Sequence, residues 1–522
     1  MYSRLRKVMD GALLGQGLKA KVFRGGAWLA TGSVVEQGSR FVRNLILVRL
    51  LAPSVFGTMA VVLSASSLLQ TCTDIGIRDA LIQNPKGDKP EYVGAAWWMA
   101  FGRALSIYCL IFLIAPLVGV FYGDAQLAPL LRVAVLTALF EGAISSRAYL
   151  ALKEMKFRKW AIVNHGGAVC GIAGTIILSV FFRNVWALVL GACFESAARC
   201  ILSFVVCPFL PPIRWDKAAF QDLLKFSRGQ FGLSFLALVY LRADIFVLAK
   251  LFSSAQVGIY TMGIYLVQVP TGFALMLLGN VMLPAFSRIQ GDQERTNQIV
   301  IKVGNVILLF GMPIVAFVFF AGRPMLSVIY GDRYAAAAGS FFIAACVAVI
   351  TLVNSQATGV FYANGSPQLH RRCVAAMALV MILITYPLAK VLGPVGGQVA
   401  CLAAMSLGCW LQLNRLHHVT GLNLSRYLGP ITQSGAAAAI VVACCLIGRS
   451  LGPLSPIATI AVGVAGLLLA YVAIGLLFLG RVRTPDQDLP TLASKQEGGI
   501  SVGAEPIVAP AVGEKLANEA SL

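Results

Sequence analysis

Three ionisable side chains share one face of an otherwise apolar stretch near the start of the chain. Glu36, Arg40 and Arg43 are spaced i, i+4 and i+7, which aligns them along one face of a helix. Inside a bilayer each such group costs about 2.5–3.5 kcal/mol, so it normally faces a cavity or an opposite charge. Arginine binds phosphate oxygens in bidentate fashion. Arg40 and Arg43 therefore predict a cationic cavity suited to an anionic head group such as pyrophosphate.

A second apolar stretch, 226–250, carries Arg242 and Asp244. We expect Arg242 to line the same cavity as the arginines of the first stretch. Two other roles remain open for these charges. The pairs Glu36–Arg40 and Arg242–Asp244 would also serve as salt bridges that only hold helices together. The two carboxylates, Glu36 and Asp244, would alternatively bind a proton or an ion that drives a conformational change.

Glu141 and Glu195 are further candidates for ion or proton coupling, and Glu195 precedes Arg199 by four residues, at salt-bridge spacing. The 12 cysteines and 4 histidines show no CxxC and no Cys/His metal-ligand spacing, which predicts neither a disulfide framework nor a metal site. No P-loop sequence for ATP occurs. We therefore expect no cofactor, no metal and no catalytic residue.

The composition places these charges in a membrane protein. Of 522 residues, 58% are hydrophobic and 12% are charged, and the mean hydropathy is +0.80. Soluble domains carry about 25% charged residues. Apolar runs of at least the ~18 residues needed to cross a bilayer recur along the chain. Lipid offers no hydrogen-bond partner to backbone groups, so these runs are predicted to be helices. The chain is therefore predicted to be an all-α integral membrane protein.

Turn residues and charges divide the apolar region into about fourteen transmembrane helices. We expect them at 26–50, 57–77, 93–121, 127–150, 159–181, 185–208, 226–250, 257–284, 301–322, 338–362, 373–391, 395–416, 430–449 and 456–479.

Basic residues orient these spans. If the N-terminus is cytoplasmic, the inside segments hold 29 of the 42 Lys and Arg residues and the outside segments 7. Cytoplasmic loops are rich in Lys and Arg, so both termini are predicted to be cytoplasmic. The same distribution explains the net charge of +20 without a nucleic-acid partner. The outside connections are short, which disfavours a membrane enzyme with an external catalytic domain.

Two sequence correspondences indicate an internal repeat. Residues 49–57 align with 250–258 at an offset of 201, and residues 121–124 align with 329–332 at an offset of 208. Both pairs occur at equivalent places between spans, which predicts two six-helix lobes followed by two C-terminal helices. The predicted organisation is a basic cytoplasmic N-terminal segment (1–24), an N-lobe (25–210), a cytoplasmic inter-lobe linker (211–225), a C-lobe (226–420), spans 13 and 14 (421–480) and a disordered cytoplasmic tail (481–522).

The segments 49–57 (RLLAPSVFG) and 74–83 (DIGIRDALIQ) resemble the start of Wzx-type oligosaccharide flippases. The segments 257–260 and 283–287 extend the resemblance into the second half. The similarity points to the colanic-acid and succinoglycan exporter branch of the multidrug/oligosaccharidyl-lipid/polysaccharide superfamily. It implies a V-shaped, MATE-like bundle in the bacterial inner membrane.

The implied substrate is an undecaprenyl-pyrophosphate-linked oligosaccharide repeat unit, carried to the periplasmic leaflet for exopolysaccharide, O-antigen or capsule biosynthesis. The mechanism we expect is alternating access, and a polysaccharide polymerase or co-polymerase is the partner besides the lipid bilayer. A lipid II flippase and a multidrug or cation antiporter of the same superfamily remain alternatives. An antiporter for cationic drugs would favour an acidic cavity, whereas the stretch 26–50 contributes two arginines and one glutamate.

Overall fold

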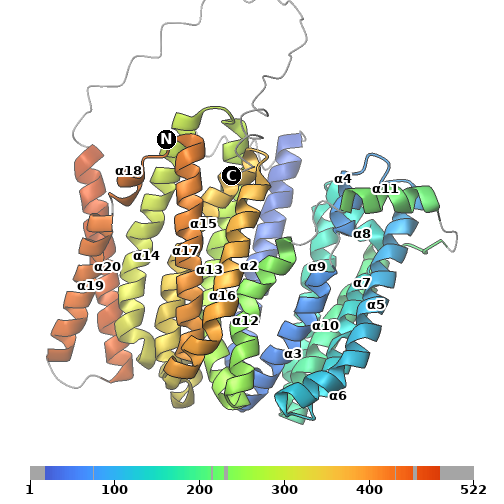
Figure 1. Cartoon of the computed structure of the whole chain (residues 1–522), viewed down its shortest axis with the longest axis horizontal. Coiled ribbons are helices and arrows are strands. Elements are labelled where there is room, and N and C mark those ends of the chain that lie inside the picture. The colour runs from blue at the N-terminus through green and yellow to red at the C-terminus, as the bar shows by residue number, and fades with distance from the viewer. Residues whose placement is uncertain are drawn as a thin grey trace, which may run out of the picture. The chain divides into compact units, whose positions relative to one another are not determined.

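The computed structural model describes residues 18–73, 76–212, 216–227, 233–429, 431–450 and 455–482. Most of the predicted basic N-terminal segment and almost all of the predicted tail lie outside these residues. Every regular element in the described part is a helix (Figure 1). The elements are α2 (Leu18–Leu50), α3 (Pro53–Cys72), α4 (Ile77–Gln83), α5 (Pro90–Tyr122), α6 (Leu127–Ala134), α7 (Leu136–Gly142), α8 (Ser146–Lys153), α9 (Phe157–Phe182), α10 (Val185–Val206), α11 (Lys217–Ser227), α12 (Leu233–Leu251), α13 (Ser254–Arg288), α14 (Gln293–Tyr330), the 3-10 helix η2 (Asp332–Ala337), α15 (Ala338–Ala363), α16 (Pro367–Leu392), α17 (Val395–Thr420), α18 (Leu424–Leu428), α19 (Ile431–Ser450) and α20 (Pro456–Val482).

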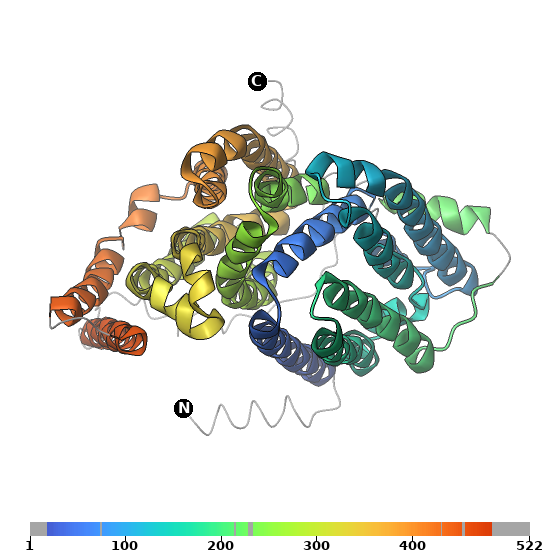
Figure 2. The same ribbon diagram turned by 90° about the horizontal axis from the view of Figure 1, so that it is seen from below.

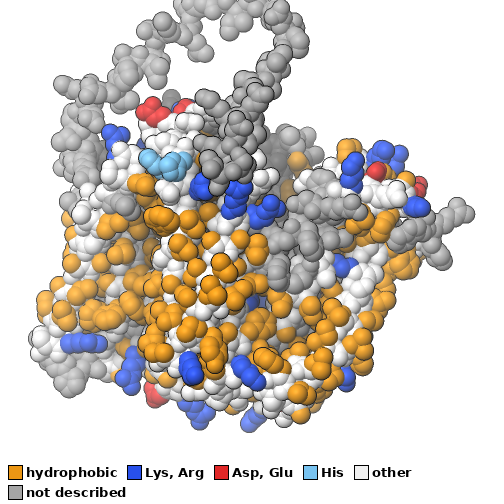
Figure 3. Space-filling view, viewed as in Figure 1, with side chains coloured by type: hydrophobic (Ala, Val, Ile, Leu, Met, Phe, Trp, Pro, Cys, Tyr) orange, Lys and Arg blue, Asp and Glu red, His pale blue; other side chains and the backbone are white. Residues whose placement is uncertain are grey.

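Most of the long helices are apolar enough to cross a membrane. In the described residues there are 11 such helices, or up to 12 if one bent pair counts as a span. Figure 3 shows apolar side chains over the middle of one face, with Lys and Arg toward its two ends. This is the pattern of a surface that faces lipid. The structure confirms the all-α, multi-pass membrane class.

Two helices that overlap predicted spans, α2 and α12, are absent from that set, and both carry ionisable side chains. α2 is 33 residues long and carries Glu36, Arg40 and Arg43. α12 is 19 residues long and carries Arg242 and Asp244. Each of the fourteen predicted ranges overlaps a helix or the broken segment formed by α6, α7 and α8, although 57–77 and 226–250 extend beyond α3 and α12. The number fourteen itself stays a prediction.

The fourth predicted span is wrong as a continuous helix. Residues 127–150 form α6, α7 and the start of α8, with a bend of 53° at the α7–α8 break. Gly142 allows α7 to approach α5, since a Cβ there would lie 2.4 Å from the Ala104 side chain. After the break, the Ser145 N–H donates to the Ser203 hydroxyl at 2.9 Å and the Ser145 hydroxyl donates to the Cys207 carbonyl at 2.8 Å. A partner on α10 therefore satisfies a backbone N–H at the break.

The predicted inter-lobe linker is partly helical. α11 occupies Lys217–Ser227 and packs on the first half of the chain through Ala219 and Leu223, which are buried among residues of α4, α5 and α8. The Tyr92 hydroxyl also donates to the Asp222 carboxylate at 2.7 Å. A short amphipathic helix thus covers one end of the first half.

Helices α2 to α10 form the first half and α12 to α17 the second, and the end-on view of Figure 2 shows the two groups meeting where α2 and α3 face α12 and α13. α19 and the first part of α20 pack on α14: Gly463 faces Phe317, and the Tyr471 hydroxyl donates to the Phe310 carbonyl at 3.0 Å. The described residues through Ala473 form one compact unit.

The two segments aligned in the predicted repeat meet where α3 crosses α13. A Cβ on Gly57 would lie 1.8 Å from the Ser254 carbonyl oxygen, and a Cβ on Gly258 would lie 1.8 Å from the Pro53 carbonyl oxygen. Gly57 and Gly258 are equivalent positions in the predicted repeat, as are Pro53 and Ser254. The first turns of α3 and α13 therefore pack against each other in a reciprocal way. Only glycine allows the two backbones to come this close.

A second reciprocal contact lies just before that crossing. Arg49, at the end of α2, donates to the Val328 and Ile329 carbonyls at 3.0 and 3.4 Å, in the last turn of α14. Its repeat equivalent, Lys250 at the end of α12, donates to the Phe121 carbonyl in the last turn of α5. Cations at helix C-termini are stabilised by the unpaired carbonyls there. We call these two contacts the reciprocal clasp.

Candidate functional site

A cavity of about 360 Å³ lies where the two halves meet. Arg40, Arg43 and Asn44 of α2 line it from the first half, and Arg242 of α12 lines it from the second. Its other polar lining residues are Ser64, Thr175, Glu195, Thr261, Tyr265 and Gln268. The structure therefore brings the three predicted arginines to one cavity. Their contact with a substrate stays a prediction.

Arg40 is held by two carboxylates from different helices. Its Nε donates to Glu36 Oε1 at 3.1 Å and its Nη1 donates to Glu195 Oε2 at 3.4 Å. Its Nη2 bonds both carboxylates, at 3.0 Å to Glu36. The Glu36–Arg40 salt bridge expected from the spacing is thus present, and Glu195 of α10 joins it from 155 residues away.

Two further side chains complete this charge cluster. Arg199 Nη2 donates to Glu195 Oε1 at 2.7 Å, as the i, i+4 spacing predicts, and lies 3.7 Å from Glu36. His165 of α9 bonds the other Glu36 oxygen, with Nδ1 and Oε2 2.7 Å apart. Gly32 makes room for this ring, because a Cβ there would lie 2.4 Å from the His165 Cδ2 atom. We call Glu36, Arg40, His165, Glu195 and Arg199 the charge cluster.

Arg43 and Arg242 differ from Arg40 in lacking such partners. Among the residues whose side chains the structure describes, neither has an ion pair or a hydrogen bond, and the buried Arg43 Nε is left without an acceptor. A buried guanidinium without an acceptor is unfavourable unless a ligand supplies one. The two halves thus each contribute to the cavity one arginine that has no ion pair or hydrogen bond among the described side chains.

The alternative in which Arg242 pairs with Asp244 is wrong. Residues i and i+2 of a helix point to different faces. Asp244 is 6% exposed, and one of its oxygens accepts from the Tyr260 hydroxyl, which in turn accepts from Gln398 Nε2 at 2.9 Å. The other oxygen, Oδ1, is buried without a partner. Asp244 therefore belongs to a polar network inside the second half and does not line the cavity.

Of the two other predicted coupling residues, one lines the cavity and one does not. Glu195 lines the cavity, whereas Glu141 lies on α7 and does not. His165 was not singled out from the sequence, because a lone histidine in an apolar stretch carries no distinguishing spacing. Tyr265 and Gln268 were also missed, and nothing in the pattern of α13 marks them.

An apolar groove of about 450 Å³ lies beside the cavity on the same two helices. Val34 and Phe41 of α2 face Leu266, Val269 and Phe273 of α13. Val34 is 48% exposed and Phe273 36%. Along α13, the groove residues 266 and 269 alternate with the cavity residues 265 and 268. A polar cavity and an apolar groove thus adjoin on α2 and α13.

Comparison with known proteins finds relatives in polysaccharide biosynthesis. The family model "Polysaccharide biosynthesis protein" matches residues 46–339. The chain is similar to the lipopolysaccharide biosynthesis protein WzxC of Escherichia coli (23% identity, covering 61% of this chain and 65% of WzxC). It is also similar to the succinoglycan biosynthesis transport protein ExoT of Rhizobium meliloti (22% identity, covering 60% and 63%). The matches thus span less than two thirds of these relatives.

Solved structures share the fold at low sequence identity. The lipid II flippase MurJ in an inward closed conformation superposes with a TM-score of 0.71 and 12% identity, over 86% of this chain and 99% of MurJ. An inward-facing MATE multidrug transporter superposes with a TM-score of 0.53 and 14% identity, over 73% and 95%. These likenesses confirm the MATE-like helical fold.

Proposed function

The chain belongs to the polysaccharide biosynthesis protein family, and we propose that it is a flippase for lipid-linked oligosaccharides. Its substrate is an undecaprenyl-pyrophosphate-linked repeat unit. It carries this lipid from the cytoplasmic to the periplasmic leaflet of the bacterial inner membrane for exopolysaccharide, O-antigen or capsule assembly. One observation carries the proposal: a cavity receives from each half an arginine without an acceptor in the described structure, and an apolar groove adjoins it.

The head group is the part that the cavity recognises. Arg43 and Arg242 offer guanidinium groups whose planar forks match phosphate oxygens. Tyr265 and Gln268, also in the lining, supply neutral donors. A pyrophosphate brings enough negative charge to compensate both arginines, which the surrounding carboxylates do not do because they are bound to Arg40 and Arg199.

The groove between α2 and α13 suits the hydrocarbon chain. Its lining is almost entirely apolar, and its rim residues Val34 and Phe273 are partly exposed. A prenyl chain passing through it would stay in contact with membrane lipid while the pyrophosphate lies in the cavity. This separation lets a transporter move a polar head group without extracting the lipid from the bilayer.

Alternating access requires contacts between the halves that break and re-form. The reciprocal clasp supplies such contacts at the end of the bundle where α2 and α12 terminate. In the predicted orientation, with cytoplasmic termini, this end faces the periplasm. The clasp then closes the periplasmic side and must open for release of the head group.

The charge cluster offers a route for coupling. Protonation of Glu36 or Glu195 weakens its hold on Arg40 and frees a third guanidinium for the cavity. We propose these two carboxylates as the principal coupling groups, with the buried Asp244 as a separate one in the second half. Glu141, on α7, is retained as a further candidate, because it has no hydrogen bond or ion pair with Arg40 in the described structure.

Two other substrates of transporters with this fold are the alternatives. Lipid II shares the pyrophosphate handle, and the MurJ-like fold is compatible with it. A cationic drug is disfavoured, because Arg43 and Arg242 would repel it and the lining carboxylate Glu195 is already bound to arginines. A transporter, rather than an enzyme, that works beside a polysaccharide polymerase or co-polymerase is therefore the function we favour.

The test is complementation of a deletion strain of the native host. Secreted polysaccharide and membrane-extracted lipid-linked repeat units are both quantified, with Arg43→Gln and Arg242→Gln compared at matched membrane abundance. We expect each variant to lower export at least tenfold and to accumulate complete, unpolymerised units. Lys390→Gln, an exposed charge outside the cavity, is the matched control and should export normally.

Other outcomes would redirect the assignment. Unchanged polysaccharide together with new sensitivity to cationic drugs would indicate an antiporter. A growth defect with accumulated lipid II would indicate peptidoglycan precursor transport.

A further inference from the structure

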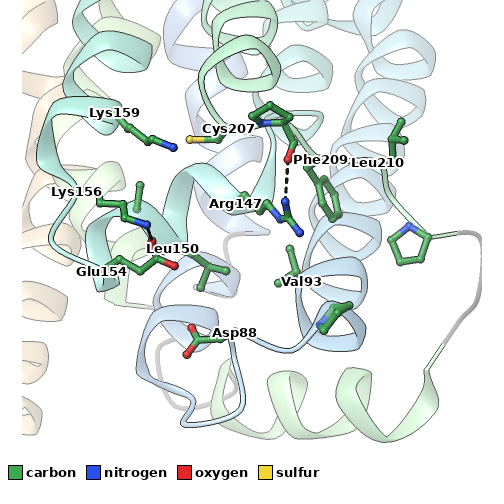
Figure 4. Close-up of a pocket in the computed structure, with 14 residues that line it drawn as sticks. Asp88, Val93, Arg147, Leu150, Glu154, Lys156, Lys159, Cys207, Phe209 and Leu210 are labelled. Carbon is green, nitrogen blue, oxygen red and sulfur yellow. Dashed lines mark hydrogen bonds and ion pairs between the residues drawn. The ribbon is translucent and has the colours of Figure 1, made fainter.

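A second cavity lies entirely within the first half of the chain. It encloses about 670 Å³ between the start of α5, α8, the α8–α9 connection and the chain that follows α10 (Figure 4). None of its lining residues lines the cavity that contains Arg43. It is therefore separate from the proposed transport path, and we call it the lateral pocket.

The charges of the lateral pocket leave two cations uncompensated. Its two carboxylates are both engaged by lysines: Glu154 lies 2.5 Å from Lys156, and Asp88 lies 3.0 Å from Lys153. Arg147 points into the middle of the pocket and donates only to the Pro208 carbonyl, at 3.2 Å (Figure 4).

Lys159, on another wall, has no ion pair within the described residues. Most of the hydrogen-bonding capacity of the Arg147 guanidinium and the Lys159 ammonium group remains available to an anion.

The remaining lining is apolar. Val93 and Leu150 form one side, and Phe209, Leu210 and Pro212 form the other. Leu210 is 92% exposed, which is unusual for a large apolar side chain unless it meets lipid or a partner. The lateral pocket therefore combines an anion-binding pair with a hydrocarbon-like rim.

Tryptophan side chains mark the depth of the lateral pocket in the membrane. Trp98 Nε1 donates to the carbonyl of the lining residue Pro212 at 2.8 Å, and the adjacent Trp97 Nε1 donates to the Ala143 carbonyl at 3.1 Å. Trp160 lies one position beyond Lys159 and packs against Tyr149. Trp and Tyr concentrate at the membrane–water interface. The pocket thus lies at the level of lipid head groups.

We propose that the lateral pocket binds the phosphate head group of an anionic phospholipid from the surrounding leaflet. Arg147 and Lys159 contact the phosphate, and the acyl chains pass over Phe209 and Leu210 into the bilayer. Basic pockets between transmembrane helices at this depth are suited to anionic lipid head groups. A soluble phosphate compound would leave the apolar rim without a partner.

The bound lipid would touch three segments that already pack together through Ala148, Cys207 and Trp160: α8, the start of α9 and the chain after α10. The first half should then depend on anionic lipid for its stability whether or not the chain transports an oligosaccharide. The proposal therefore stands apart from the transport function.

The test measures lipid binding to the purified full-length chain by native mass spectrometry in detergent. Phosphatidylglycerol and phosphatidylcholine with identical acyl chains are titrated, and inorganic phosphate is added as a competitor. The variants are Lys159→Gln and Arg147→Gln/Lys159→Gln. Arg158→Gln is the matched control, because it removes the same charge from the next position, which does not line the pocket.

We expect phosphatidylglycerol to bind more tightly than phosphatidylcholine. The double variant should lose about tenfold in phosphatidylglycerol affinity, as expected for lost charge-assisted contacts, and the control should change less than twofold. If the double variant does not fold, a several-fold loss in Lys159→Gln alone supports the proposal, since that side chain is exposed. Equal binding of both lipids, an equal loss in Arg158→Gln, or displacement of the lipid by millimolar inorganic phosphate would overturn it.

Discussion

The charge cluster and the cavity predict opposite consequences for two arginines one turn apart on α2. Arg40 bonds both Glu36 and Glu195, whose side chains are 15% and 11% exposed. Arg40→Gln leaves Arg199 as the one arginine within ion-pair distance of these two carboxylates among the described residues. Arg43→Gln removes a guanidinium whose Nε has no acceptor in the described structure. The first change should therefore destabilise the fold, and the second should not.

The magnitude follows from the burial of the cluster. Removing one partner of a fully buried ion pair costs about 3–5 kcal/mol. The Arg40 side chain is 23% exposed and Arg199 still compensates one carboxylate, so we expect a loss of about 2–3 kcal/mol in the free energy of unfolding. Arg43→Gln should stay within about 0.5–1 kcal/mol of the wild type.

The assay is unfolding of the purified protein in mixed detergent micelles, arranged as a double-mutant cycle. Arg40→Gln, Glu195→Gln and the double variant are compared, with Arg43→Gln as the control. The double variant removes both charges and should recover about 1–2 kcal/mol relative to the sum of the single changes. Strict additivity, or an Arg43→Gln variant as unstable as Arg40→Gln, would refute the division of roles between the two arginines.

Two further predictions concern the contacts between the halves. Gly57→Ala places a Cβ 1.8 Å from a carbonyl oxygen of α13, so α3 and α13 must move apart. We expect the free energy of unfolding to fall by about 3 kcal/mol or more, and membrane abundance to fall with it. Gly279→Ala, at an open position of the same partner helix, should be neutral; equal losses would contradict the crossing. Arg49→Gln/Lys250→Gln removes both donors of the reciprocal clasp. In a chain that also carries Gln268→Cys in the cavity, maleimide labelling of that position from the periplasmic side should then accelerate several-fold. An unchanged labelling rate would show that the clasp does not close that side.

The helices were predictable because membrane spans are long, apolar and local in sequence. The 26–50 and 395–416 ranges, for example, fall within α2 and α17. The break after Gly142 was not predictable, because it depends on Ser203 and Cys207, which lie about sixty residues further along the chain. Helix ends also differ: α2 begins at Leu18, inside the segment expected to be a separate N-terminal region.

The candidate site was predictable only as far as single helices determine it. The i, i+4, i+7 spacing correctly places Glu36 beside Arg40, because both lie on one helix. Glu195 and His165 approach the same cluster from α10 and α9, and no local pattern encodes that packing. The spacing therefore identified which arginines gather at the cavity but not which of them lack an acceptor there.

The central claim is that the chain moves a lipid-linked oligosaccharide between leaflets, using Arg43 and Arg242. The most direct measurement is the accessibility of lipid-linked repeat units to a membrane-impermeant sugar-oxidising label in spheroplasts of a polymerase-deficient host. The account predicts labelled units with the wild-type chain, and shielded units both without the chain and with Arg43→Gln/Arg242→Gln at equal membrane abundance. Equal labelling with and without the chain would contradict it.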